Sequence, residues 1–266
     1  MKRMSAWTRI DSRECSAVAA DALLEFPEIR HGVTTRHHDL NLSLRTGPDP
    51  ATVLANRAHA ASLFGATLGD LIIPDQVHGA AVTAVRRLDD GTLSSDKRNA
   101  DALVTNTPGV LLGITIADCL PVFLYDPAHR AIGLAHSGWR GTAGLIVANT
   151  LQVMNREFGS KPCDITAAVG PGIGGCCYEV GHEVREALLA ISAPDSAFRP
   201  SPNGRWMLDL SSIITAQLLA AGIPAASVSV SPWCTFCNND LFFSHRKEGS
   251  MAGRMGAFLK LAASTD

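Results

Sequence analysis

The chain has 266 residues, of which 46% are hydrophobic and 18% are charged, and its formal net charge at pH 7 is −2. This length is enough to bury a substantial core, and the composition is that of a globular protein and not of a disordered one. The small net charge gives no electrostatic reason to expect a nucleic acid or an anionic membrane as the main partner.

The cysteine content and the absence of long apolar runs predict a cytoplasmic protein. The first thirty residues have no uninterrupted apolar region of the signal-peptide type, and no run approaches the roughly 20 apolar residues that span a bilayer. Seven cysteines are an odd number. We therefore expect reduced thiols, some of them metal ligands, and no disulfide framework.

The predicted elements of the first half are one helix and several short strands. Asp49 caps a helix that Pro50 opens and Gly65 ends. Its apolar face is formed by Val53, Leu54, Ala58, Ala61 and Phe64. Short strands are expected around 71–73 and 81–86, followed by a buried strand pair, Val110–Ile116 and Pro121–Tyr125, which ADCLP interrupts.

The second half alternates irregularly between strands and helices. A strand at 131–135 is followed by a turn at Gly138–Gly141 and a helix from about 142 to 158. The later elements are a strand at 165–169, helices at 183–191 and 211–221, and a strand at 228–230. Without repeats or linkers, this order predicts one domain over residues 1–266, with an α/β (α+β) fold of layered mixed β-sheets flanked by helices.

Three metal-capable side chains lie at the predicted ends of strands. They are His78 in DQVHG, Cys119 in ADCLP and His136 in AHSGWRGT. Zn²⁺ accepts two imidazoles and a thiolate, and three protein ligands leave a fourth position open, as catalytic zinc requires. Since the residues are far apart in the sequence, only the fold can bring them together. The alternative is a buried thiol that packs as a small hydrophobe, beside hydrogen-bonded structural histidines.

Arginines and glycines in turn-like segments indicate an anion site. Arg36, Arg140 and Arg246 lie among Gly, Ser, Thr or His, and a guanidinium suits phosphate or carboxylate. A surface salt bridge is the alternative for each. The segment Gly170–Gly175 resembles a phosphate loop but lacks the Lys-Ser/Thr of a Walker motif, so it indicates only a close approach of the backbone.

The sequence CTFC, Cys234–Cys237, allows a redox or a zinc-ribbon interpretation. A thioredoxin-type motif would open a helix after the first strands, whereas this one lies near the C-terminus. There is no second CxxC to complete a four-cysteine zinc site. The motif alone therefore does not indicate a function.

Taken together, six motifs resemble the YfiH family of laccase-domain, or polyphenol-oxidase-like, proteins, which are understood as purine nucleoside phosphorylases. The resemblance runs from about His31 to Leu259, on DQVHG, ADALVT, TIADCLPVFLYD, AHSGWRGT, GPGIGGCCYEVG and CTFCNNDLFFSHRKEG…GRMGAFL. It implies a four-layer sandwich of mixed sheets and helices. It also implies a zinc site formed by His78, Cys119 and His136, with copper ranked behind zinc.

The resemblance further implies which residues act on the substrate. Arg36 and Arg140 would join the three metal ligands in catalysis, and Arg36, Asn41, Arg140 and Arg246 would bind substrate or phosphate. The segment HGVTTRHHDLNLSL has a shortened glycine-rich loop between Arg36 and Asn41. Cys234, Phe242 and Ser244 also match the family pattern, whereas Cys237 does not. Asp118 would either orient a ligand histidine or make a structural hydrogen bond.

The implied activity is phosphorolysis of adenosine, inosine and guanosine to the free base and ribose 1-phosphate. Adenosine deamination and phosphorolysis of S-methyl-5'-thioadenosine would accompany it, so the expected partners are a purine nucleoside and phosphate, with neither nucleic acid nor membrane. Four alternatives stay open. They are a cysteine hydrolase or deamidase with Cys119 as nucleophile and His136 as base, a copper polyphenol oxidase, an enzyme that edits a cell-wall amino-sugar nucleotide, and a non-catalytic binding protein.

Overall fold

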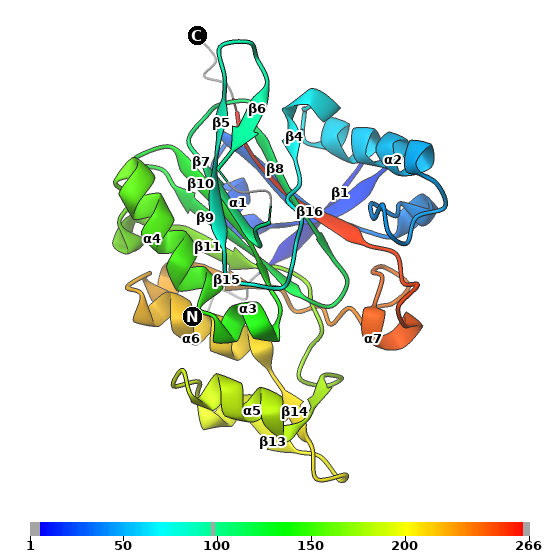
Figure 1. The fold of residues 1–266 in the computed structure, drawn as a ribbon, viewed down its shortest axis with the longest axis vertical. Coiled ribbons are helices and arrows are strands. Elements are labelled where there is room, and N and C mark those ends of the chain that lie inside the picture. The colour runs from blue at the N-terminus through cyan, green and yellow to red at the C-terminus, as the bar shows by residue number, and fades with distance from the viewer. Residues whose placement is uncertain (1–5, 97–98, 263–266) are drawn as a thin grey trace.

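Two large mixed β-sheets form the centre of the computed structural model, which describes residues 6–96 and 99–262 (Figure 1). In spatial order, the six-stranded sheet contains β1 (Trp7–Asp11), β2 (Ser16–Ala20), β3 (Ile29–Thr34), β16 (Met255–Leu261), β8 (Leu111–Ile116) and β4 (Leu71–Ile72). The seven-stranded sheet contains β15 (Val228–Val230), β11 (Thr166–Val169), β9 (Leu120–Asp126), β10 (Ala131–Ser137), β7 (Ala102–Thr105), β5 (Val82–Arg87) and β6 (Leu93–Ser95).

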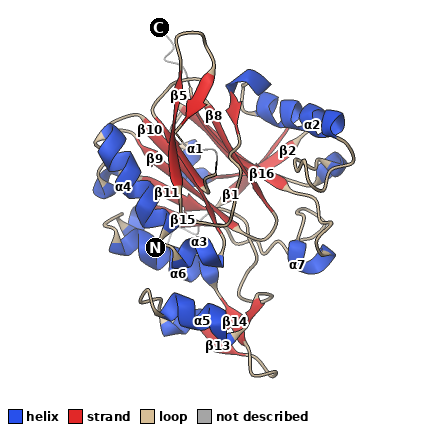
Figure 2. Ribbon diagram, viewed as in Figure 1, coloured by secondary structure: helices blue, strands red, loops and turns tan. Residues whose placement is uncertain are grey.

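Helices and a small third sheet complete the fold. The helices are α1 (Asp21–Leu24), α2 (Pro50–Leu63), α3 (Trp139–Ala143), α4 (Ile146–Phe158), α5 (His182–Leu189), α6 (Leu210–Ala220) and α7 (His245–Glu248). The third sheet has the order β12 (Glu179–Val180), β14 (Trp206–Leu208) and β13 (Phe198–Pro200). With α5 it forms a projection at one end of the molecule (Figure 2). No helix in the described part of the chain is long and apolar enough to cross a membrane.

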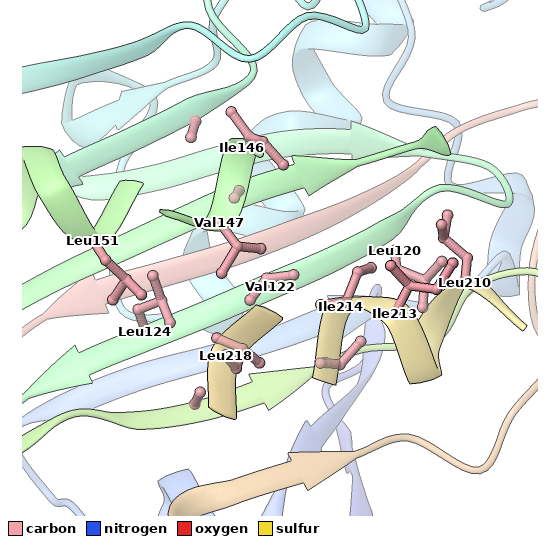
Figure 3. Close-up of a cluster of buried hydrophobic side chains, with 14 of the residues drawn as sticks. Leu120, Val122, Leu124, Ile146, Val147, Leu151, Leu210, Ile213, Ile214 and Leu218 are labelled. Carbon is pink, nitrogen blue, oxygen red and sulfur yellow. The ribbon is translucent and has the colours of Figure 1, made fainter. Parts of the chain in front are cut away.

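Four layers follow from how the sheets bury their faces. Strand β9 is buried along its whole length, and its side chains alternate between two cores. Phe123 and Tyr125 pack toward the six-stranded sheet. Leu120, Val122 and Leu124 pack against Ile146, Val147 and Leu151 of α4 and Leu210, Ile213, Ile214 and Leu218 of α6 (Figure 3). Helix α2 covers the outer face of the six-stranded sheet through Ala60 and Ala61. The predicted four-layer sandwich is confirmed.

The predicted strand pair is wrong, because β8 and β9 lie in different sheets. Strand β8 pairs with β16 and β4, whereas β9 pairs with β10 and β11. Both runs are buried on both faces, so the apolar pattern gave the strands but not their partners. The connection at 117–119 crosses from one sheet to the other, and Asp118 has a φ of 85° there.

Two further expectations need correction. The helix expected at about 142–158 is two helices, α3 and α4, because Leu145 adopts a left-handed φ of 61° between them. Helix α2 has the predicted cap, where Asp49 accepts a hydrogen bond from the Thr52 N–H at 2.9 Å, and Gly65 ends it with a φ of 65°. Leu54, however, is 46% exposed and does not belong to the buried face.

His31 on β3 is a buried histidine that the core keeps neutral. Only 2% of the residue is exposed, and its Nε2 accepts a hydrogen bond from the Ala20 N–H at 2.9 Å. Burial lowers the pKa of His31 from 6.5 to about 4. Protonation of Nε2 would also break its hydrogen bond to the backbone.

We expect His31 to reduce stability in mild acid. The unfolded chain binds this proton first as the pH falls through 6.5, so stability is lost from there down to about pH 4, by about 3 kcal/mol. The variant His31→Gln should lack this component. Urea unfolding at several pH values would measure the difference, with the exposed His37→Gln as control. Parallel pH profiles for wild type and His31→Gln would contradict the assignment.

Candidate functional site

A cavity of about 820 Å³ opens where the strand ends of the two large sheets meet. Its wall includes the loop Ile73–Gln76, the sheet crossing at 117–119, the first residues of α3, and Tyr178. The sequence-predicted residues His78, Cys119, His136, Arg140 and Arg246 all line it. The volume is in the usual range for pockets that bind small molecules.

The three predicted metal ligands converge in this cavity. One nitrogen each from His78 and His136 and the Cys119 sulfur all lie within 4.8 Å of one another. Cys119 comes from the sheet crossing, His136 from the end of β10, and His78 from the loop after β4. A Cβ atom on Gly138 would lie 2.9 Å from the Cys119 sulfur, so only glycine leaves room for the donor atoms here.

Asp101 holds two of the three side chains in place, and the sequence analysis missed this role. Its fully buried carboxylate contacts the His136 Nδ1 at 2.9 Å and leaves the His136 Nε2 available. It also accepts the backbone N–H groups of Val77, His78 and Gly79, at 3.2, 3.0 and 2.7 Å. Asp101 lies in the motif ADALVT, which is one of the six motifs that carry the family resemblance. The motif does not indicate that its aspartate orients the histidines.

The electrostatics of the three side chains favour a thiolate. Burial alone would raise the pKa of Cys119, but the charge of His136 and hydrogen bonds from both histidines lower it from 9.0 to about 6. Burial alone would lower the pKa of His136, but the Cys119 thiolate and Asp101 raise it to about 9. Without a bound ion, Cys119 and His136 therefore form a thiolate–imidazolium pair near neutral pH.

The cavity wall is rich in arginine. Its guanidinium groups come from Arg45, Arg57, Arg140, Arg246 and Arg254, whereas the lining carboxylates among the described residues are those of Asp75 and Asp118. Arg140 stacks on Trp139, at 4.3 Å from the ring centroid. Arg57 and Arg254, which the sequence analysis missed, donate to the carbonyl oxygens of Leu42 and Gly253. The wall therefore suits an anionic ligand.

Asp118 is fully occupied by structural hydrogen bonds. Its Oδ1 accepts from the Thr235 Oγ1 at 2.6 Å and from the Ser244 Oγ at 2.8 Å. Its Oδ2 accepts from the Arg246 N–H at 2.6 Å. Of the two roles that the sequence left open for Asp118, the structure shows the structural hydrogen bond.

Arg36 and Asn41 lie outside the cavity lining. The Arg36 Nη1 donates to the Glu248 Oε1 and to the Asn239 carbonyl, both at 2.9 Å, and Arg36 stacks over Phe243. Asn41 accepts from the Ser43 and Arg254 N–H groups, both at 3.0 Å. Both side chains support loops that carry lining residues. Neither side chain lines the cavity, so the structure gives no direct contact for the catalytic and binding roles predicted for Arg36 and Asn41.

Sequence and structure comparisons agree on the family. The model of the family described as multi-copper polyphenol oxidoreductase laccase matches residues 26–262. The purine nucleoside phosphorylase YlmD of Geobacillus stearothermophilus is 38% identical over 242 residues, which cover 86% of this chain and 88% of YlmD. The adenosine deaminase RL5, from an unknown prokaryotic organism, is 36% identical over 221 residues, which cover 81% of this chain and 84% of RL5.

A solved structure shows the same fold. The crystal structure of the Bacillus licheniformis hypothetical protein YfiH superposes with a TM-score of 0.86 at 32% identity, covering 96% of this chain and 98% of that protein. The chain belongs to the laccase-like family that the sequence predicted, and relatives in it are named as enzymes. The family description and the convergent donor atoms both indicate a metal site.

We expect Cys119 to be the most reactive thiol in metal-stripped protein near neutral pH. Its alkylation rate by iodoacetamide should rise with a midpoint near pH 6, because the thiolate is the nucleophile. Mass spectrometry of tryptic peptides would follow labelling, with the exposed Cys163 as internal reference. In His136→Gln the midpoint should move up in pH. An unchanged midpoint in that variant would contradict the pairing.

Proposed function

We propose that this chain is a cytoplasmic, zinc-dependent purine nucleoside phosphorylase. It would convert adenosine, inosine or guanosine and phosphate to the free base and ribose 1-phosphate, with adenosine deaminase and S-methyl-5'-thioadenosine phosphorylase activities at the same site. The observation that supports this most is the position of the three donor atoms, within 4.8 Å of one another in an arginine-lined cavity. The names of the relatives supply the reaction class.

The donor set fits zinc. Two imidazoles and one thiolate match the three-ligand sets of catalytic zinc, and the lowered pKa of Cys119 supplies the thiolate that the ion requires. Asp101 fixes the His136 tautomer so that Nε2 is the ligand atom. When bound, zinc would supply a Lewis acid able to activate water or bind a phosphate oxygen.

The arginines and aromatic walls account for the two substrates. Arg140 stacks on Trp139, and within the described residues its guanidinium has no hydrogen bond to another side chain or to the backbone, so its donors are available to phosphate. Arg246 already donates to the Glu179 carbonyl at 2.8 Å and stacks over Tyr178, which positions the ring. Trp139 and Tyr178 offer apolar faces for a purine. Holding phosphate beside the sugar carbon supplies a large part of the rate enhancement.

Replacing Cys119 tests the metal assignment. The variant Cys119→Ala should lose the zinc bound in this cavity, and phosphorolysis of inosine should fall by at least about a hundredfold, because the set of three ligands becomes incomplete. Metal analysis and HPLC of the purine product would measure both effects, with Cys163→Ala as control. Full phosphorolysis by purified Cys119→Ala would show that the assignment is wrong.

Replacing Arg140 tests the phosphate site. The variant Arg140→Gln should raise the KM for phosphate about tenfold to a hundredfold, since a hydrogen bond to a charged group contributes about 1.5–3 kcal/mol. The KM for inosine should change little. Arg156→Gln, which removes an arginine outside the cavity, is the matched control. Equal changes in both KM values would place Arg140 elsewhere in the mechanism.

The thiolate–imidazolium pair favours one second candidate, the cysteine hydrolase or deamidase with Cys119 as nucleophile and His136 as base. A chelated, metal-free sample separates the two functions. A hydrolase keeps its activity after chelation and loses it on alkylation of Cys119. The phosphorylase loses its activity on chelation and regains it when zinc is added back.

A further inference from the structure

Four cysteines outside the proposed zinc site lie together in the structure. Cys176 and Cys177 follow the glycine-rich segment, and Cys234 and Cys237 form the CxxC motif. Their sulfur atoms all lie within 4.8 Å of one another. The fold thus completes the set of four that the sequence analysis did not find, because the second pair is a vicinal CC and not a CxxC. We call these residues the four-cysteine cluster.

Backbone contacts fix the two segments against each other. The Thr235 N–H donates to the Gly172 carbonyl at 2.9 Å, and Gly172 and Cys234 form an isolated parallel bridge. The Gly174 N–H donates to the Cys234 sulfur at 3.2 Å. A Cβ atom on Gly174 would lie 3.1 Å from the Cys234 Cβ, so glycine permits this close approach.

We propose a second metal site in this protein, a tetrathiolate centre that binds one zinc ion through Cys176, Cys177, Cys234 and Cys237. A tetrahedral ion with Zn–S bonds of about 2.3 Å places its sulfurs about 3.8 Å apart. The Cys237 sulfur lies 3.4 Å from that of Cys177 and 3.6 Å from that of Cys176. These separations are close to those of a zinc tetrathiolate and far longer than a disulfide bond of about 2.05 Å.

The surroundings of the four-cysteine cluster suit a negatively charged centre. Zn²⁺ bound by four thiolates carries a net charge of −2 after the thiol protons are released. Lys247 places its Nζ 3.3 Å from the Phe236 carbonyl, inside the CxxC motif. Arg199 donates to the Gly175 carbonyl at 2.7 Å, next to Cys176. Two cations thus lie against the two segments that carry the ligands.

The proposed centre has a structural role beside the cavity. Cys177 immediately precedes the lining residue Tyr178, and Thr235 in the CxxC motif donates to Asp118, which precedes Cys119. One ion would therefore fix both segments in the wall of the cavity. With four protein ligands the ion has no open position, so it takes no part in the reaction.

Metal counting on the full chain tests the proposal. Protein purified under reducing conditions should contain two zinc ions per chain, and Cys119→Ala should contain one. Cys163→Ser, which removes an exposed cysteine outside both sites, should still contain two. No zinc in Cys119→Ala would overturn the four-cysteine site, whereas one ion in both the wild type and Cys119→Ala would count against the cavity zinc alone.

Cobalt substitution identifies the ligands without relying on activity. Co²⁺ in Cys119→Ala should show the strong thiolate-to-metal charge-transfer absorption of a tetrahedral tetrathiolate, and Cys177→Ser/Cys237→Ser in the same background should abolish it. Absence of that absorption in Cys119→Ala, or a disulfide within the cluster in the freshly reduced and desalted wild type, would overturn the proposal. Absence of phosphorolysis in the zinc-loaded wild type, with the cobalt absorption of Cys119→Ala intact, would instead count against the proposed function alone.

Discussion

The buried Asp101 carboxylate is the contact on which the geometry of the site depends. Burial alone would raise the pKa of this group, but hydrogen bonds from His136 and from the backbone N–H groups of 77–79 hold it below its usual value. A buried charge is tolerated only when its acceptor positions are filled, and Asp101 fills them with the groups that aim two of the three donor side chains. Its backbone takes part as well, because the Asp101 carbonyl accepts the His136 N–H at 2.7 Å.

The sheet crossing supplies the third donor. In a hairpin, Cys119 would lie at the edge of a single sheet. The chain instead leaves the six-stranded sheet at Ile116 and enters the seven-stranded sheet at Leu120, so the intervening residues reach the cavity between them. Asp118 has a φ of 85°, a strained conformation that three hydrogen bonds stabilise. Cys119 is therefore held by its neighbour's contacts to residues over a hundred positions away.

Sequence reasoning found the parts that depend on local chemistry. The cap of α2, strand β15 and the donor types of the three candidate ligands follow from residue identity and short-range pattern. Strand partners did not follow, because β8 and β9 are apolar on both faces and carry no alternation to set which neighbour each takes. Asp101 was missed because it acts through His136 and the backbone of 77–79, which are distant in sequence. Arg254 was missed because its neighbours in the sequence do not indicate that it lines the cavity. The placement of Arg36 behind the wall also depends on a long-range partner, Glu248.

The arginine-rich wall has to be held together before an anion binds. Five guanidinium groups in one cavity repel one another, and burial lowers the pKa of both Arg57 and Arg254. The chain limits this cost by bonding Arg57, Arg246 and Arg254 to carbonyl oxygens, which fixes them without neutralising them. Their positive field therefore remains directed into the cavity, where a phosphate dianion would meet it. Among the described residues, neither Arg45 nor Arg140 has such a partner on its guanidinium, which leaves these two with most to gain from a bound anion.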